Sequence, residues 1–141
     1  MNTEEEKPQP RGIRNNNPGN LRANPDIMWK HQNGIDADGF LIFDDPVFGI
    51  RALAMVLRHY VEYNNLTMIA TMIRKFAPDT ENDTEAYIKA VAEYTGIGPY
   101  ETVDLKAQGR AIVKAIILHE NGEQPYDDDT IGQGIHLSHI Q

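Results

Sequence analysis

Four consecutive segments of this 141-residue chain carry apolar residues at spacings of three and four, the period of an amphipathic helix. Each is bounded by polar or proline start signals and by proline or glycine stop signals. The first begins after Asp45-Pro46 and repeats through Ile50, Leu57 and Val61. The others are expected over residues 65–76, 83–94 and 104–121. A chain with this pattern can fold only around packed helices.

The remaining segments favour irregular structure. Residues 11–45 are rich in Asn, Gly, Pro and Asp, which predicts turns. One short strand is expected in "GFLIF", residues 39–43, pairing with the segment around Met28 and Trp29 as a hairpin. Residues 1–10 predict a disordered tail, and residues 126–141 an extended tail that packs back through Ile131, Ile135, Leu137 and Ile140. The predicted fold is mainly α (α+β), a single domain over residues 11–141 with a small irregular β region.

Composition excludes several classes of function. Thirteen Lys and Arg against twenty-one Asp and Glu give a net charge of −8, which argues against nucleic acid as a partner. There is no cysteine, and the histidines of "HLSH" match no metal-ligand spacing, so we expect no metal and no cofactor. No stretch is long enough to insert in a membrane, and no signal peptide is apparent. If the protein is made in the cytoplasm and acts in the periplasm, a holin pore, a secretion apparatus or a virus particle would have to carry it there.

Glu120 is the main candidate for catalysis. Helical spacing places it three residues after Ile117 and four after Ile116, on the apolar stripe of its helix. A carboxyl group at the edge of an apolar wall is desolvated, and desolvation raises its pKa toward the range of a general acid. Gly122 would let the chain turn away and leave the carboxyl group facing a cleft. The alternative is a frayed last turn, with Glu120 pointing to water.

Other polar residues near the start and middle of the chain admit two interpretations each. The stretch "RNNNPGNLR" concentrates amides that suit sugar hydroxyls and N-acetyl groups, although tight turns need the same residues. Trp29 can stack on a sugar or anchor a loop. Glu81 is a reserve acid, although capping of the following helix explains it as well.

Two resemblances extend this reading. "RGIRNNNPGNLR", Trp29, "GFLIFDDPVFGIRALAMVLRHY", "FAPDTENDTEAYI" and "ILHENG" resemble a family of phage and prophage proteins that are labelled virion or structural proteins. More distantly, the chain is similar to peptidoglycan glucosaminidases and other lysozyme-like hydrolases, in which a helix ends in the catalytic Glu before an Asn-rich β region. Here that helix, "RAIVKAIILHENG", follows the β region, which implies a circular permutation with the chain ends close together.

The second resemblance implies a role for each candidate. Glu120 would be the general acid/base of an enzyme that cuts peptidoglycan glycan strands, and no second acid sits at a dependable position. A lytic transglycosylase or a substrate-assisted reaction needs only one such residue. The candidate substrate-binding residues are Asn16, Asn17 and Asn20 for N-acetyl groups, Arg14 for stem-peptide carboxylates, and Trp29, Tyr60 and Tyr87.

Two functions of other classes remain open. The chain would also fit a non-catalytic virion or host-interaction protein on a lysozyme-like scaffold, with other virion or secretion-apparatus proteins as partners. A third option is a cytoplasmic inhibitor of a host enzyme.

Overall fold

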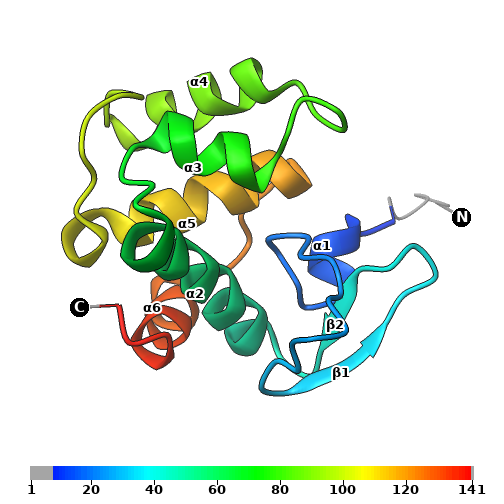
Figure 1. Ribbon diagram of the computed structural model, residues 1–141. Helices are drawn as coiled ribbons and strands as arrows, with labels where there is room; N and C mark the ends of the chain where they lie inside the picture. Colours follow the sequence, from blue (N-terminus) through cyan, green and yellow to red (C-terminus); the bar gives the residue numbers. More distant parts are fainter. Residues whose placement is uncertain (1–7, 141) are drawn as a thin grey trace, which may run out of the picture.

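The computed structural model describes residues 8–140, and the predicted tail over residues 1–10 therefore lies mostly outside the described residues. Within them the chain forms six helices and one two-stranded sheet (Figure 1). The fold is mainly helical with a small β region, as the sequence predicts. The elements are α1 (Arg11–Arg14), β1 (Gln32–Ile35), β2 (Leu41–Phe43), α2 (Pro46–Asn64), α3 (Ile69–Phe76), α4 (Thr84–Thr95), α5 (Leu105–Asn121) and α6 (Asp128–Leu137).

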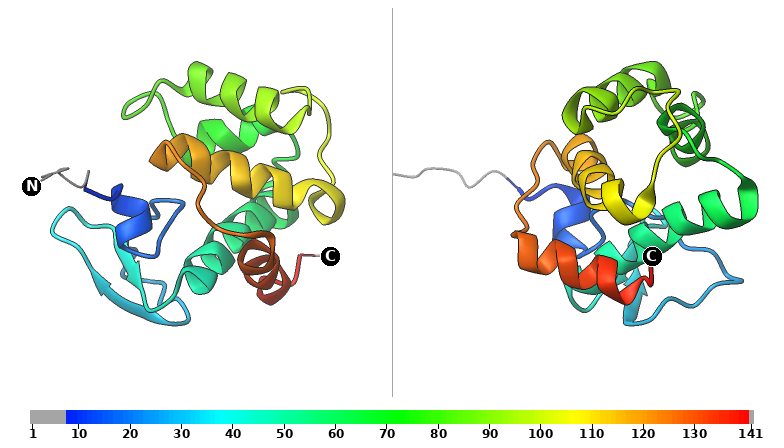
Figure 2. Two further views of the ribbon diagram at one scale, coloured as in Figure 1. Left: turned by 180° about the vertical axis from the view of Figure 1, so that it is seen from behind. Right: turned by 90° about the vertical axis from the view of Figure 1, so that its left-hand side faces the viewer.

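Two parts of the molecule differ in character. The N-terminal region, residues 11–45, holds α1, both strands and long loops, whereas the helical region, residues 46–140, holds α2 to α6. In Figures 1 and 2, α5 runs through the middle of the helical region, with α3 and α4 on one side and α2 and α6 on the other. The beginning of α2 and the end of α5 both meet the N-terminal region, because β2 contacts α2 and α1 contacts α5.

The predicted helix boundaries in α2, α4 and α5 are confirmed by their caps. The side chains of Asp45, Asp83 and Asp104 each accept hydrogen bonds from backbone N–H groups of the first turn. Gly96 and Gly122 end α4 and α5 with φ of 74° and 73°, where a glycine meets no Cβ penalty. These local signals act within one turn, so the sequence alone locates them.

Helix α3 begins later than predicted, at Ile69 rather than at residue 65 or 66. Residues 67 and 68 are extended because they pair with a distant segment. The Val103 N–H donates to the Thr67 carbonyl at 2.8 Å, and Met68 forms an isolated antiparallel bridge with Thr102. Pairings between residues 34 and 36 positions apart have no local sequence signal.

The expected extended tail at the C-terminus is wrong, because residues 128–137 form α6. The Asp127 side chain accepts from the Thr130 N–H, and Asp128 and Asp129 lie in the first turn, where acidic residues favour a helix. Gly132 and Gly134 weaken the local helix preference, but Gly134 allows close packing on α2. A Cβ added there would lie 2.5 Å from the Ile50 Cγ2.

The hairpin prediction is confirmed for one strand and wrong for its partner. β2 lies within "GFLIF", but it pairs antiparallel with residues 32–35, with an irregularity between Gln32 and Gly34. Met28 instead lies in a loop with 81% of its surface exposed. The Asp36 side chain closes the hairpin, since its Oδ1 accepts from the Asp38 and Phe40 N–H groups at 2.9 Å.

The two ends of the described part of the chain do not meet. α1 and the C-terminal end of α6 lie on opposite sides of the molecule in Figure 1 and in the left view of Figure 2. The expected closeness of the ends is therefore wrong for residues 8–140. The part of the chain that returns to the N-terminal region is the end of α5, and the chain then continues away along α6.

Candidate functional site

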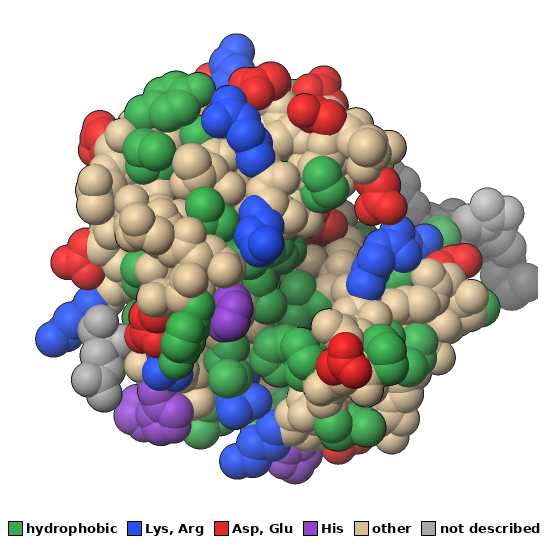
Figure 3. Space-filling model, in the orientation of Figure 1, with side chains coloured by type: hydrophobic (Ala, Val, Ile, Leu, Met, Phe, Trp, Pro, Cys, Tyr) green, Lys and Arg blue, Asp and Glu red, His purple; other side chains and the backbone are tan. Residues whose placement is uncertain are grey.

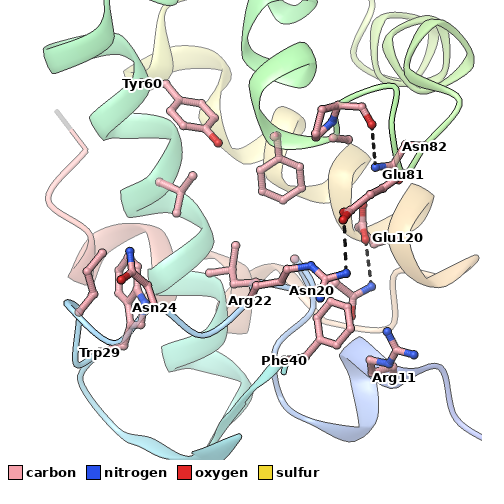
Figure 4. Close-up of a pocket in the computed structure, with 17 residues that line it drawn as sticks. Arg11, Asn20, Arg22, Asn24, Trp29, Phe40, Tyr60, Glu81, Asn82 and Glu120 are labelled. Atoms are coloured by element: carbon pink, nitrogen blue, oxygen red, sulfur yellow. Dashed lines mark hydrogen bonds and ion pairs between the residues drawn. The ribbon is translucent and has the colours of Figure 1, made fainter. Parts of the chain in front are cut away.

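A cleft of about 590 Å³ lies between the N-terminal region and the helical region (Figure 4). The space-filling view shows this face hollowed, with basic and acidic side chains around the hollow (Figure 3). Apolar and aromatic side chains line it together with charged and amide groups from both regions. The lining residues are Arg11, Gly19, Asn20, Leu21, Arg22, Asn24, Ile27, Trp29, Phe40, Val56, Tyr60, Phe76, Ala77, Pro78, Glu81, Asn82 and Glu120.

Glu120 lies in the last turn of α5 and faces this cleft, half-buried rather than in open solvent. Its Oε1 accepts a hydrogen bond from the Asn20 Nδ2 at 2.9 Å, and its Oε2 accepts from the Tyr87 hydroxyl at 2.8 Å. Figure 4 shows the Asn20 contact crossing from one region to the other. The last turn is not frayed, and both carboxyl oxygens are fixed by neutral donors.

Tyr87 of α4 supports Glu120 from the helical side. The residue is 1% exposed, and its ring packs against the His119 ring at 3.8 Å between centroids, with the ring planes tilted by 32°. Burial, followed by the neighbouring Glu120 charge and the hydrogen bond to it, raises the pKa of the Tyr87 hydroxyl far above its usual value. The hydroxyl therefore keeps its proton and acts as a donor. Tyr87 does not line the cleft, so it would affect a ligand only by holding the Glu120 carboxyl group in place.

Asn121, the residue after Glu120, also connects the two regions. The Asn121 Nδ2 donates to the Pro18 carbonyl at 2.8 Å and to the Ile117 carbonyl at 2.9 Å. Gly12 of α1 lies against the amide oxygens of both asparagines. A Cβ there would come within 2.5 Å of the Asn121 Oδ1 and 2.9 Å of the Asn20 Oδ1. A glycine at this position lets α1 approach α5 closely enough to bring Asn20 to Glu120.

Two of the predicted amide ligands have another role. Asn17 is fully buried, and its side chain bonds the Leu21 N–H and the carbonyls of Leu21 and Leu41 at 2.9 to 3.0 Å. The Asn16 Nδ2 donates to the Phe43 carbonyl at 3.1 Å. Neither lines the cleft. The expectation that they bind N-acetyl groups is corrected: they hold loop backbone to β2, and Asn20 alone of the three faces the cleft.

The other predicted ligands are divided between cleft and surface. Arg14 is exposed and does not line the cleft. Trp29 lines the cleft and also packs on the small apolar cluster of the N-terminal region. Its position is therefore compatible with both interpretations, stacking on a sugar and anchoring a loop. Tyr60 lines the opposite wall, 8% exposed, and burial raises the pKa of its hydroxyl to about 12. Trp29 and Tyr60 are thus brought to the same cleft as Glu120.

Glu81, the reserve acid, lies in the loop before α4 and lines the same cleft. Its carboxylate forms an ion pair with the Arg22 Nη2 at 3.7 Å, across the opening between the two regions (Figure 4). Asp83, and not Glu81, caps α4.

Among the cleft residues that the sequence did not indicate, Arg11, Arg22 and Phe40 form one group. Arg11 and Arg22 place their guanidinium carbons 4.2 and 4.5 Å from the centroid of the Phe40 ring. Both arginines flank the amide-rich stretch, and this was the available signal, but no local rule pairs them with a ring eighteen or more residues away.

Neither a metal cluster nor a membrane-spanning helix is found in the part of the chain that the structure describes. No group of three or more His, Asp or Glu side chains within residues 8–140 could hold an ion. None of the helices there is both long and apolar enough to cross a membrane. The groups in the cleft that could act on a ligand are the Glu120 carboxyl group with its two hydrogen-bond donors and the Glu81 carboxyl group. Two arginines and several aromatic side chains lie beside them.

Comparison with known proteins gives one informative relative. No family model matches the chain. Protein P5 of Pseudoalteromonas phage PM2 is 41% identical over 127 residues, which cover 88% of this chain and 79% of the relative. Identity at this level over most of both chains indicates common descent and a shared fold. The chain therefore belongs to the family of phage PM2 Protein P5.

Proposed function

We propose that this phage-related protein cleaves the glycan strand of peptidoglycan, with Glu120 as its acid/base group. One observation carries the proposal. The Glu120 carboxyl group stands in a cleft between two regions and is held by a donor from each of them, Asn20 and Tyr87. A polymer lying in the cleft would pass both regions, and the carboxyl group would reach it from the helical side.

The arrangement suits a reaction with a single acid/base residue. Glu120 would give a proton to the glycosidic oxygen while the C1–O bond breaks. The substrate's own C6 hydroxyl or N-acetyl oxygen would then form the new bond to C1. In the first case Glu120 would take back the proton of the C6 hydroxyl. In the second, water would attack C1 and give a proton to Glu120 while the bond between C1 and the N-acetyl oxygen breaks. Asn20 and Tyr87 would keep the carboxyl group in position, and Trp29 and Tyr60 would supply aromatic contact surface for sugar rings.

Glu81 supports a two-carboxylate variant of the same proposal. It lines the same cleft, and a second carboxylate could act as base or nucleophile. Its ion pair with Arg22 would have to open for that role. Glu120 is preferred because its neighbours fix both of its oxygens.

A lysozyme-like scaffold in permuted order belongs to this proposal. What supports it is the arrangement of parts: a carboxylate at the end of a helix, a small β region opposite, and a cleft between. The Glu-bearing helix comes after the β region in the chain, and α6 follows it.

The test is cleavage of purified cell walls, followed by turbidity and by mass spectrometry of released muropeptides. Glu120→Gln should lower the rate by about a hundredfold or more, the usual contribution of a general acid. Glu123→Gln is the matched control, because it makes the same substitution at an exposed residue outside the cleft. An anhydro sugar in the products would identify transglycosylation. Undiminished cleavage by Glu120→Gln would remove Glu120 from the mechanism.

A second candidate is a non-catalytic virion or host-interaction protein that uses the cleft for binding. The family relationship supports it more directly than it supports cleavage, since it links the chain to a phage and carries no reaction with it. Its partners would be other virion or secretion-apparatus proteins. Fixed stoichiometry in purified particles, together with intact cell walls after incubation, would favour this function over the first. Either function fits association with a virion or delivery to the periplasm.

A further inference from the structure

Two arginines on the N-terminal side of the cleft are held by one aromatic ring. The guanidinium carbons of Arg11 and Arg22 lie 4.2 and 4.5 Å from the centroid of Phe40, whose ring is buried. We call these three residues the Arg–Phe–Arg stack. Stacking on a ring orients a guanidinium group before a ligand arrives, so less conformational entropy is lost on binding. All three residues line the cleft that contains Glu120.

The two arginines of the stack form only long, exposed ion pairs with their carboxylate partners. Arg11 meets Asp38 at 3.5 Å and Arg22 meets Glu81 at 3.7 Å, both longer than the roughly 2.8 Å of a strong charge-assisted hydrogen bond. All four side chains are at least a third exposed, and ion pairs of this kind contribute little to stability. A carboxylate from a ligand can therefore replace Asp38 or Glu81 at small cost.

The local charge contrasts with that of the whole molecule. The chain carries a net charge of −8, which would repel an acidic polymer. Around the cleft, the stack is joined by Lys75 of α3, whose Nζ lies 5.9 Å from the ring centroid of Tyr60, another cleft residue. Basic side chains border the hollow in Figure 3, together with acidic ones. The cleft lining holds two arginines against two glutamates, so it lacks the acidic excess of the whole molecule and can accept a ligand that brings its own negative charge.

We propose that the Arg–Phe–Arg stack is a carboxylate-binding subsite, so that the cleft selects a glycan bearing carboxylates over a neutral glycan. This rests on the proposed function and specifies the substrate of the same cleft. Arg22 exchanges Glu81 for the carboxylate of the ligand, and the ion pair across the cleft opens as the polymer enters. The stack takes over the role that the sequence suggested for Arg14.

Binding is measured by calorimetry in the Glu120→Gln background, which prevents turnover. The two probes are a neutral chitin tetrasaccharide and a peptidoglycan tetrasaccharide with its stem peptides. We expect the acidic probe to bind about tenfold more tightly at low ionic strength, corresponding to about 1.4 kcal/mol. Added Arg11→Gln and Arg22→Gln should abolish that preference, because the affinity for the acidic probe should fall about tenfold. Arg14→Gln, the charge-matched control, should keep the preference.

Glu81→Gln tests the exchange without touching the stack. It should raise affinity for the acidic probe several-fold and not for the neutral one, because Arg22 no longer has a competing partner. Equal affinity for both probes, unaffected by the arginine substitutions, would overturn the subsite and leave the glycan proposal standing. Binding of neither probe would overturn both proposals.

Discussion

The helical region buries one continuous apolar cluster to which every helix from α2 to α6 contributes, from Ile50 to Ile131. The N-terminal region has only a small cluster around Leu21, Leu41 and Phe43, completed by Ala52 of α2. Its loops are instead tied together by asparagine side chains that bond backbone groups, with Asn17 at the centre. Where apolar surface is scarce, satisfied buried amides fix the backbone, and this leaves the cleft side free for polar residues.

The largest loss of stability is expected from a substitution where the two regions touch. A Cβ at Gly49 of α2 would lie 1.9 Å from the Asn16 carbonyl oxygen. Gly49→Ala should therefore lower the free energy of unfolding by about 4 kcal/mol, because backbone must move. Gly109→Ala is the matched control in a helix, since its Cβ would meet only ordinary contacts at 3.9 Å and should stabilise by about 0.5 kcal/mol. Urea denaturation measures both. Equal values would show that the regions do not meet as described.

Removing the central amide tests whether the N-terminal region depends on it. Asn17→Ala leaves one buried N–H and two carbonyls without their side-chain partner, and should cost about 3 kcal/mol. The exposed Asn33→Ala should change stability by less than about 0.5 kcal/mol. Hydrogen exchange should show the loss of protection concentrated in residues 11–45. A loss of less than about 1 kcal/mol would mean that apolar packing, and not the amide network, stabilises this region.

Tyr87→Phe removes the donor that the helical region supplies to Glu120. The buried ring is kept, so stability should fall by only about 1 kcal/mol. Cell-wall cleavage should fall by roughly tenfold, because the Glu120 carboxyl group loses one of its two anchors. The exposed Tyr94→Phe serves as control in the same helix. Unchanged cleavage would separate Tyr87 from the function of Glu120.

The smallest change in stability is expected when the pH is lowered and Asp36 takes up a proton. Hydrogen bonds from the Phe40 N–H first, and then from the Asn15 side chain and the Asp38 N–H, hold the pKa of Asp36 below its ordinary value of 3.8. A lowered carboxyl pKa contributes stability that is present above pH 3.8 and is lost as the pH falls through the folded value. The hairpin should therefore lose exchange protection in that window. Asp36→Asn should remove this dependence, and an unchanged titration in that variant would assign it elsewhere.

Much of the helical region could be predicted because its signals are local. The caps Asp45, Asp83 and Asp104 and the stops Gly96 and Gly122 act within one turn, and the apolar period identifies the buried face. α6 was missed because Gly132 and Gly134 lower the local helix preference, and packing on Ile50 compensates. The late start of α3 and the partner of β2 were missed because each depends on pairing with another segment.

In the candidate site, the sequence located Glu120 on the buried face of its helix, but not its neighbours. Asn16, Asn17 and Asn20 look alike in the sequence, and only the fold assigns the first two to backbone and the third to the cleft. The Arg–Phe–Arg stack likewise joins residues that no periodic pattern connects.

The sequence by itself determined the helices, their ends and the face of α5 that carries the carboxyl group, because these follow from interactions between residues a few positions apart. Tertiary structure alone decided that Glu120 meets Asn20, one hundred positions earlier, and that Tyr87 completes the contact. Such contacts form when Gly12 and Gly49 let two backbones approach closely. The stability of these contacts comes from several segments that are far apart in the sequence, so no single segment predicts them.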